Sequence, residues 1–167
     1  MSRQPLLGRS ALLATVLTLL AQLARAQTPP QPALTPQKGD VVPAFETLAV
    51  DGKPSKLDFP KGSKTVLLFF LSSCPVCHKM IPEWNSAYER RPKDLKVVGV
   101  IMDQEPPGFF GTVSVAFPVV RSPGNQFLRS LNVNRAPVTL RVGDGGRVED
   151  VALGIVDPIR LGELFKP

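Results

Sequence analysis

The two cysteines of this 167-residue chain, Cys74 and Cys77, are separated by two residues. A disulfide across so short a loop is a poor structural staple, because the entropy that a crosslink removes from the unfolded chain grows with the length of the loop. Two neighbouring thiols are instead suited to exchange, since a thiolate attacks a disulfide and the second thiol resolves the mixed product. The spacing therefore indicates redox chemistry.

The first 26 residues have the three-part layout of a secretory signal. Arg3 and Arg9 precede an apolar run, residues 11–24, which at 14 residues is short for a membrane-spanning helix. Ala24-Arg25-Ala26 then supplies a small-x-small cleavage pattern. We therefore expect a periplasmic or otherwise exported protein; the alternative is an uncleaved N-terminal membrane anchor.

Composition and charge exclude several other classes of protein. With 43% hydrophobic and 20% charged residues, the chain has the composition of one ordinary globular domain and not of a polytopic membrane protein. Part of its net charge of +6 comes from residues 1–26, which hold three Arg and no acidic residue, so the remainder carries +3. Because the other basic residues are scattered, there is no electrostatic case for a nucleic-acid partner.

The hydrophobic pattern after residue 26 predicts the strands and the helix that position the cysteines. The Pro-rich segment 27–38 predicts an extended linker, followed by a single domain over 39–167. Two nearly continuous apolar runs, 64–71 and 95–102, predict neighbouring buried strands. Helical spacing between them, through about Tyr88, implies a parallel strand-helix-strand unit. Cys74 is then expected at the junction of strand and helix.

The remaining segments predict shorter elements. Residues 39–57, with the turn Asp51-Gly52, predict a β-hairpin, and 103–111 predict a loop. A short helix is expected to open at Ser122-Pro123. The chain then predicts a hairpin of strands 138–142 and 148–156, and a last helix capped by Asp157-Pro158 with Ile159, Leu161, Leu164 and Phe165 on its apolar face.

The cysteine segment, Leu67-Leu-Phe-Phe-Leu-Ser-Ser-Cys74-Pro-Val-Cys77, resembles the thioredoxin fold when it is taken with Pro82 and Ala136-Pro137-Val-Thr-Leu140. Gly39-Asp40-x-x-Pro43-x-Phe45 is similar to the exported TlpA/ResA-like branch, which includes cytochrome-maturation and accessory proteins. The resemblance implies an α/β, thioredoxin-like domain with a mixed central β-sheet flanked by helices and an N-terminal β-hairpin extension.

The two cysteines are expected to have different roles. Unpaired N–H groups at a helix N-terminus stabilise an anion, so Cys74 is the expected nucleophile. Cys77, one turn into the helix and less exposed, is expected to resolve the mixed disulfide. Pro75 and Val76 are expected to tune the redox potential, and His78, the only His, either stabilises the thiolate when protonated or faces solvent.

The resemblance implies further that Pro137 is a cis proline against the cysteine pair and that the backbone of Ala136 binds the substrate polypeptide. Three positions depart from the family pattern. Leu68 and Met80 stand where relatives carry a buried carboxylate, and Ser73 stands where a Trp is common. The proton acceptor for Cys77 is then water or an unidentified group.

These features predict an exported thiol-disulfide oxidoreductase with no cofactor beyond its redox-active disulfide. A reductant is favoured, because the short stretch between Met102 and Pro137 has little room for the helical insertion of the strong periplasmic oxidants of this fold. Its partners would be substrate proteins with disulfides or thiols and a membrane electron donor. The alternative is a Cu(I) metallochaperone that uses the two cysteines and His78.

Overall fold

The computed structural model describes residues 35–166. The segment 1–26, predicted as a secretory signal, and most of the predicted linker lie outside the described residues. Within residues 35–166, no helix has both the length and the apolar character needed to cross a membrane.

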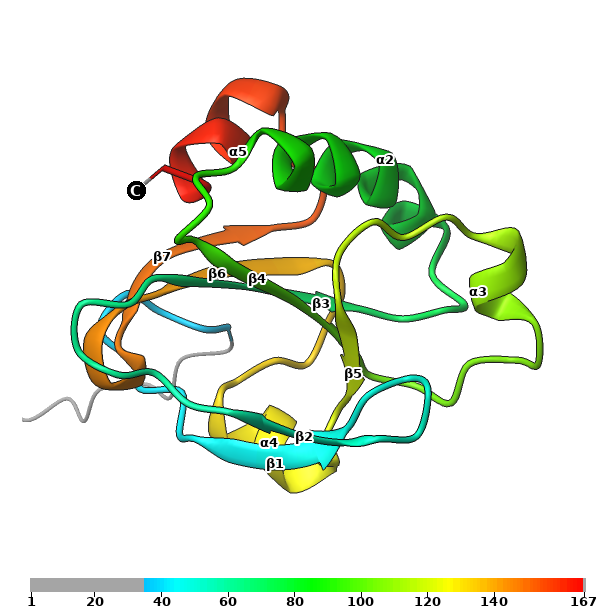
Figure 1. Ribbon diagram of the computed structural model, residues 1–167, viewed down its shortest axis with the longest axis horizontal. Coiled ribbons are helices and arrows are strands. Elements are labelled where there is room, and N and C mark those ends of the chain that lie inside the picture. Colours follow the sequence, from blue (N-terminus) through cyan, green and yellow to red (C-terminus); the bar gives the residue numbers. More distant parts are fainter. Residues whose placement is uncertain (1–34, 167) are drawn as a thin grey trace, which may run out of the picture. The chain divides into compact units, whose positions relative to one another are not determined.

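A five-stranded mixed β-sheet organises the described part of the chain, as predicted (Figure 1). Its strand order is β5-β4-β3-β6-β7, with β3 parallel to β4, β4 parallel to β5, and the β3-β6 and β6-β7 pairs antiparallel. The strands are β3 (Thr65–Phe70), β4 (Lys96–Ile101), β5 (Val119–Arg121), β6 (Val138–Val142) and β7 (Val148–Leu153). Since β3 and β4 are parallel, their carboxyl ends meet at one edge of the sheet, where the cysteines follow β3.

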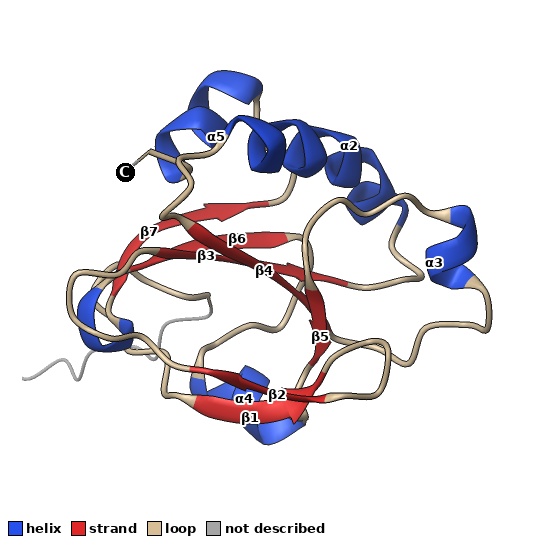
Figure 2. Ribbon diagram, in the orientation of Figure 1, coloured by secondary structure: helices blue, strands red, loops and turns tan. Residues whose placement is uncertain are grey.

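Helices cover both faces of this sheet (Figure 2). On one face lie α2 (Pro75–Arg90) and α5 (Pro158–Leu164). On the other lie α4 (Asn125–Ser130) and the predicted hairpin, formed by β1 (Phe45–Leu48) paired antiparallel to β2 (Pro54–Leu57).

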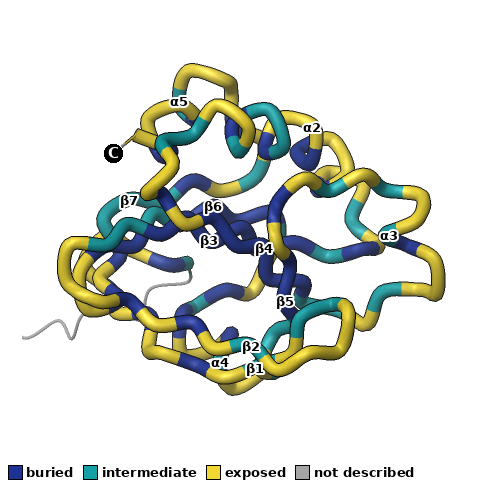
Figure 3. The backbone as a smooth tube through the Cα atoms, in the orientation of Figure 1, coloured by how far each residue is buried: buried dark blue, intermediate teal, exposed yellow. Residues whose placement is uncertain are grey.

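Strand β3 is buried on both faces, which explains its continuous apolar sequence (Figure 3). Leu68 and Phe70 point into the cluster beneath α2 and α5. The alternate residues Leu67 and Phe69 point into the cluster beneath α4 and the hairpin. The strand that leads to the cysteines is therefore fixed by two cores at once.

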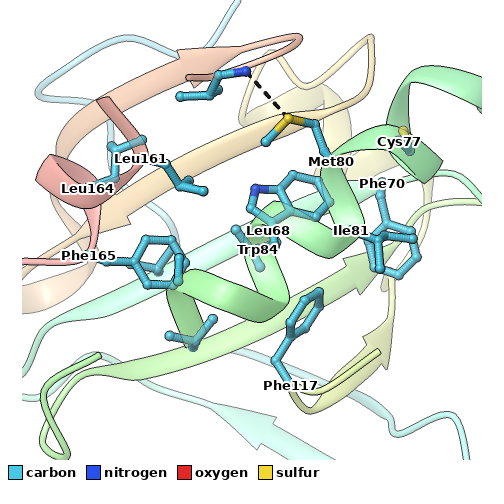
Figure 4. Close-up of a cluster of buried hydrophobic side chains, with 14 of the residues drawn as sticks. Leu68, Phe70, Cys77, Met80, Ile81, Trp84, Phe117, Leu161, Leu164 and Phe165 are labelled. Atoms are coloured by element: carbon cyan, nitrogen blue, oxygen red, sulfur yellow. Dashed lines mark hydrogen bonds between the residues drawn. The ribbon is translucent and has the colours of Figure 1, made fainter. Parts of the chain in front are cut away.

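Trp84 fills the centre of the core beneath α2 (Figure 4). Its side chain is fully buried, and its ring centroid lies 6.3 Å from those of Phe70 and Phe117. The indole N–H donates to the hydroxyl of buried Thr139 on β6 at 3.2 Å. This contact joins the helix that carries the cysteines to the sheet beneath it.

The N-terminal extension pairs with both outer strands of the sheet. Beside β5, the N–H of Val50 donates to the carbonyl of Val119 at 3.3 Å. Beside β7, the N–H of Gly39 donates to the carbonyl of Val148, whose own N–H donates to the carbonyl of Asp40, both at 2.8 Å. Further along β7, the N–H of Val151 donates to the carboxylate of Asp150 at 2.8 Å and its carbonyl accepts from Arg160 at 3.2 Å.

Two of the shorter predicted segments differ from the structure. The segment 103–111, predicted as a loop, contains the start of a four-residue helix, α3 (Phe109–Thr112). The burial of Phe109 anchors this turn, a tertiary effect that its Pro- and Gly-rich surroundings obscure. The helix predicted to open at Ser122 instead begins at Asn125, because the Ser122 hydroxyl accepts a hydrogen bond from Gly124 within the preceding turn.

The last hairpin and helix also differ in part from the prediction. Strand β7 ends at Leu153, three residues before its predicted end at 156. The predicted cap is confirmed, since the Asp157 carboxylate accepts from two N–H groups of the first turn of α5. Ile159, however, is 82% exposed and does not belong to the apolar face with Leu161 and Leu164.

Gly146 should tolerate no side chain. Its φ is +82°, and a Cβ atom there would fall on the carbonyl oxygen of Val42. Gly146→Ala is therefore expected to lower the free energy of unfolding by at least about 2 kcal/mol. Gly62, at φ +77° with no atom within 4 Å of such a Cβ, is the matched control. Urea unfolding measures both variants. An equal decrease in the free energy of unfolding for Gly146→Ala and Gly62→Ala would show that the positive φ, and not the clash with Val42, causes the loss.

Candidate active site

Cys74 lies where β3 gives way to α2, as predicted, and it forms the N-cap of that helix. Its sulfur accepts a hydrogen bond from the backbone N–H of Cys77 at 3.2 Å. Both cysteines are free thiols, Cys74 partly exposed and Cys77 fully buried. The cap geometry therefore presents one sulfur to a partner and keeps the other behind it.

Burial raises the pKa of the Cys77 thiol to about 12, and the hydrogen bond with Cys74 adds to this effect. At neutral pH Cys77 is a protonated thiol. Because the thiolate is the reactive form, Cys77 is poorly suited to open an exchange reaction.

A cis peptide bond joins Ala136 to Pro137, as the family resemblance implied. The Ala136 carbonyl lies 3.9 Å from the sulfur of Cys74. On its other side, the Pro137 carbonyl accepts from the N–H of Gly154 at 2.9 Å. The Ala136–Pro137 segment thus lies between Cys74 and Gly154 and contacts both.

The floor beneath the cysteine pair is apolar. Leu68 and Met80 are buried, and the Met80 sulfur accepts a hydrogen bond from the N–H of Val156 at 3.4 Å (Figure 4). Met80 therefore connects the cysteine helix to the segment that follows β7, although it offers no group that could take a proton from Cys77.

The turn before Cys74 is held by Asp103, a residue that the sequence reasoning missed. Asp103 follows β4 and accepts four hydrogen bonds from the backbone and hydroxyl groups of Ser72 and Ser73. Burial alone would raise the pKa of this carboxyl, but the bonds from the two serines hold it below its usual value. Its place directly after a strand parallel to β3 was the signal that could have revealed it.

His78 is bonded to the same turn. Its Nε2 atom lies 2.7 Å from the carbonyl oxygen of Ser72, and since a carbonyl only accepts, this nitrogen carries a proton. The ring also packs against Phe109 of α3, with centroids 5.9 Å apart. Although exposed, His78 is oriented by the turn and by α3, which lies beside the start of α2 (Figure 1).

The motif residues and the cis-proline region supply an apolar rim. Pro75 and Val76 form the first turn of α2, and Val76 is 37% exposed. Leu153 and Ile155, which flank Gly154 beside Pro137, are 38% and 65% exposed. The segments that carry Cys74 and adjoin Pro137 thus each expose apolar side chains.

The candidate metal ligands at this site are Cys74, Cys77 and His78. Within residues 35–166, no three His, Cys, Asp or Glu side chains lie close enough together to hold a metal ion. The proton on His78 Nε2 is directed at Ser72, which removes that nitrogen as a ligand in this arrangement.

Comparison with known proteins places the chain among redox proteins. The family model described as Redoxin matches residues 37–160. Sporulation thiol-disulfide oxidoreductase A of Bacillus subtilis (strain 168) is 27% identical over 142 residues, which cover 80% of this chain and 86% of that protein.

Two solved structures share the fold. The crystal structure of StoA from Bacillus subtilis superposes with a TM-score of 0.63 at 24% identity, covering 74% of this chain and 97% of that one. A thiol:disulfide interchange protein of the thioredoxin family from Chlorobium tepidum TLS superposes with a TM-score of 0.63 at 21% identity, covering 77% and 95%.

Proposed function

Because the chain belongs to the Redoxin family, as a TlpA/ResA-like thiol-disulfide oxidoreductase, we propose that it is an exported reductant of protein disulfides. The observation that carries the proposal is the asymmetry of the pair: Cys74 caps α2 with its sulfur partly exposed, whereas Cys77 is buried behind it. Cys74 is the proposed nucleophile and Cys77 the proposed resolving thiol.

The proposed reaction has two exchange steps. The Cys74 thiolate attacks one sulfur of the substrate disulfide, so a Cys74–substrate bond forms and the other substrate sulfur leaves as a thiolate. Cys77 then loses its proton to water and attacks the Cys74 sulfur, which breaks the Cys74–substrate bond and releases the second substrate sulfur as a thiolate. The substrate gains two electrons and the Cys74–Cys77 pair is left as a disulfide.

The surrounding residues support these steps. The N–H of Cys77 points at the Cys74 sulfur and stabilises its anionic form. We propose that the Ala136–Pro137 segment, whose Ala136 carbonyl lies 3.9 Å from that sulfur, binds the substrate backbone. The exposed side chains of Val76, Leu153 and Ile155 are proposed to contact the substrate side chains. Pro75 removes one backbone donor from the first turn of the helix, which limits stabilisation of the thiolate.

Two features support the reducing direction and export. Between β4 and Pro137 the only helices are α3 and α4, of four and six residues, so this stretch holds no large helical insertion. Residues 1–26 have the layout of a secretory signal. An exported reductant needs electrons from the cytosol, so we propose a membrane-bound donor that restores the dithiol.

Equilibration of residues 27–167 with glutathione and dithiothreitol buffers tests the direction. We expect a reduction potential close to the value of about −270 mV found for thioredoxin, because the buried Cys77 and apolar floor give little stabilisation to the thiolate form. Cys74→Ser, which cannot form the disulfide, is the control for the signal. A potential near about −120 mV would make the protein an oxidant.

A further inference from the structure

The turn that precedes Cys74 is bonded to a residue outside the cysteine motif. One carboxylate oxygen of Asp103 accepts from the N–H of Ser72 at 2.8 Å. The other accepts from the Ser72 hydroxyl at 2.9 Å and from the N–H and hydroxyl of Ser73 at 3.3 and 3.2 Å. Asp103 is 31 residues from Ser72 in sequence, so this contact depends on the parallel alignment of β3 and β4.

The same turn is bonded on its other side by the cysteine helix. His78 Nε2 donates to the Ser72 carbonyl at 2.7 Å, so the N–H, hydroxyl and carbonyl of Ser72 are all engaged. Ser72 is 95% buried, which makes the loss of any one partner costly. The N–H of Cys74 donates to the Leu71 carbonyl across this turn at 3.3 Å. The direction of Cys74 is therefore set by residues on both sides of it.

Asp103 also carries charge close to the cysteines. Burial and the Cys74 thiol are the larger causes of the raised pKa of Cys77, and the charge of Asp103 raises it further. The four hydrogen bonds keep Asp103 ionised at neutral pH. The negative charge of Asp103 therefore opposes the loss of the proton that Cys77 must give up before it attacks the mixed disulfide.

We propose that Asp103 is a positioning residue for disulfide exchange, which fixes the Ser72–Ser73 turn ahead of Cys74. The inference rests on the proposed function, because it concerns the geometry of the same two thiols. It also gives Ser73 a role, as a second donor to the carboxylate.

Two variants separate the bonds of Asp103 from its charge. Asp103→Asn keeps an acceptor for Ser72 and removes the charge. The double variant Ser72→Ala/Ser73→Ala keeps the charge and the two backbone donors and removes both hydroxyl bonds. Asp94→Asn, an exposed change beyond the far end of α2, is the matched control for loss of one negative charge.

In the full chain, Asp103→Asn is expected to move the second step of the thiolate titration at 240 nm to lower pH, because it removes a negative charge that opposes ionisation of Cys77. The groups that act on Cys77 in that titration are the Cys74 thiol, the Leu71 backbone and Asp103. The double serine variant is expected to leave the titration unchanged and to slow exchange with a model disulfide by about threefold or more. Asp94→Asn is expected to match the unmodified chain in both.

The outcomes separate this inference from the proposed function. If the unmodified chain cycles reversibly but Asp103→Asn leaves the titration unchanged and the double serine variant leaves the exchange rate unchanged, Asp103 is only a structural residue and the inference fails. If Asp103→Asn does not fold, an unchanged exchange rate in the double serine variant overturns the positioning role. Failure of the unmodified chain to cycle would instead overturn the proposed function.

Discussion

Cys74→Ser is expected to lower the rate of disulfide exchange by about a thousandfold or more, to the uncatalysed background. The reason is that Cys74 has the only partly exposed sulfur of the pair, whereas Cys77 is fully buried and its pKa is raised to about 12 by burial. Reduction of a model protein disulfide, followed by the change in its absorbance or turbidity, measures the rate. Retention of more than a tenth of the activity would show that Cys77 can open the reaction.

Cys77→Ser is the matched control, because it replaces the other cysteine sulfur with the same hydroxyl group. This variant should still attack, but it should accumulate a mixed disulfide through Cys74, visible as a mass increase that dithiothreitol reverses. In the unmodified chain, release of the mixed disulfide should accelerate as the pH rises, since Cys77 must lose its proton before it attacks. Trapping through Cys77 in the Cys74→Ser variant would reverse the two roles.

Trp84→Ala is expected to lower the free energy of unfolding by about 3 to 5 kcal/mol, the largest stability loss expected from one substitution here. Trp84 is fully buried between Phe70 and Phe117, and its truncation leaves a cavity that the sheet and helix cannot both close. Urea unfolding followed by far-ultraviolet circular dichroism measures the loss without relying on the Trp signal. A loss below about 1.5 kcal/mol would mean that α2 moves to fill the space.

The hydrogen bond from Trp84 to Thr139 can be separated from the packing of the ring. Thr139→Val leaves the indole N–H buried without this partner and should cost about 1 to 3 kcal/mol. In Trp84→Phe/Thr139→Val both polar partners are absent, so the double variant should lose less than the sum of the two single changes. Thr139→Ser, which removes the methyl group but keeps the hydroxyl, should retain the hydrogen bond to Trp84. Full additivity would show that the bond contributes nothing.

The elements that carry the cysteines could be predicted because their sequence signals are strong and local. Strand β3 consists of six consecutive buried residues, and the helical spacing that follows it fixes the start of α2. The short α3 could not be predicted, since its four residues become helical through the burial of Phe109 rather than through propensity.

The candidate site was predicted where its residues belong to one short motif and missed where they do not. Cys74, Cys77 and the cis bond before Pro137 follow from the motif and the resemblance. Asp103 was not identified, because its contact with Ser72 depends on the register that aligns Phe70 with Ile101 at the ends of two strands. The sequence alone does not show that Asp103 and Ser72 lie close together in space.

The pairing of the N-terminal extension with β5 and β7 bears on how the chain meets other polypeptides. A free edge strand is a template to which another chain can add, and it is a common route to aggregation. Here Val50 occupies part of one edge, while Gly39, Asp40 and the side chains of Asp150 and Arg160 occupy part of the other. Removal of the extension to obtain a minimal domain would uncover backbone groups on both sides. The extension thus limits the addition of a foreign strand at either flank of the sheet.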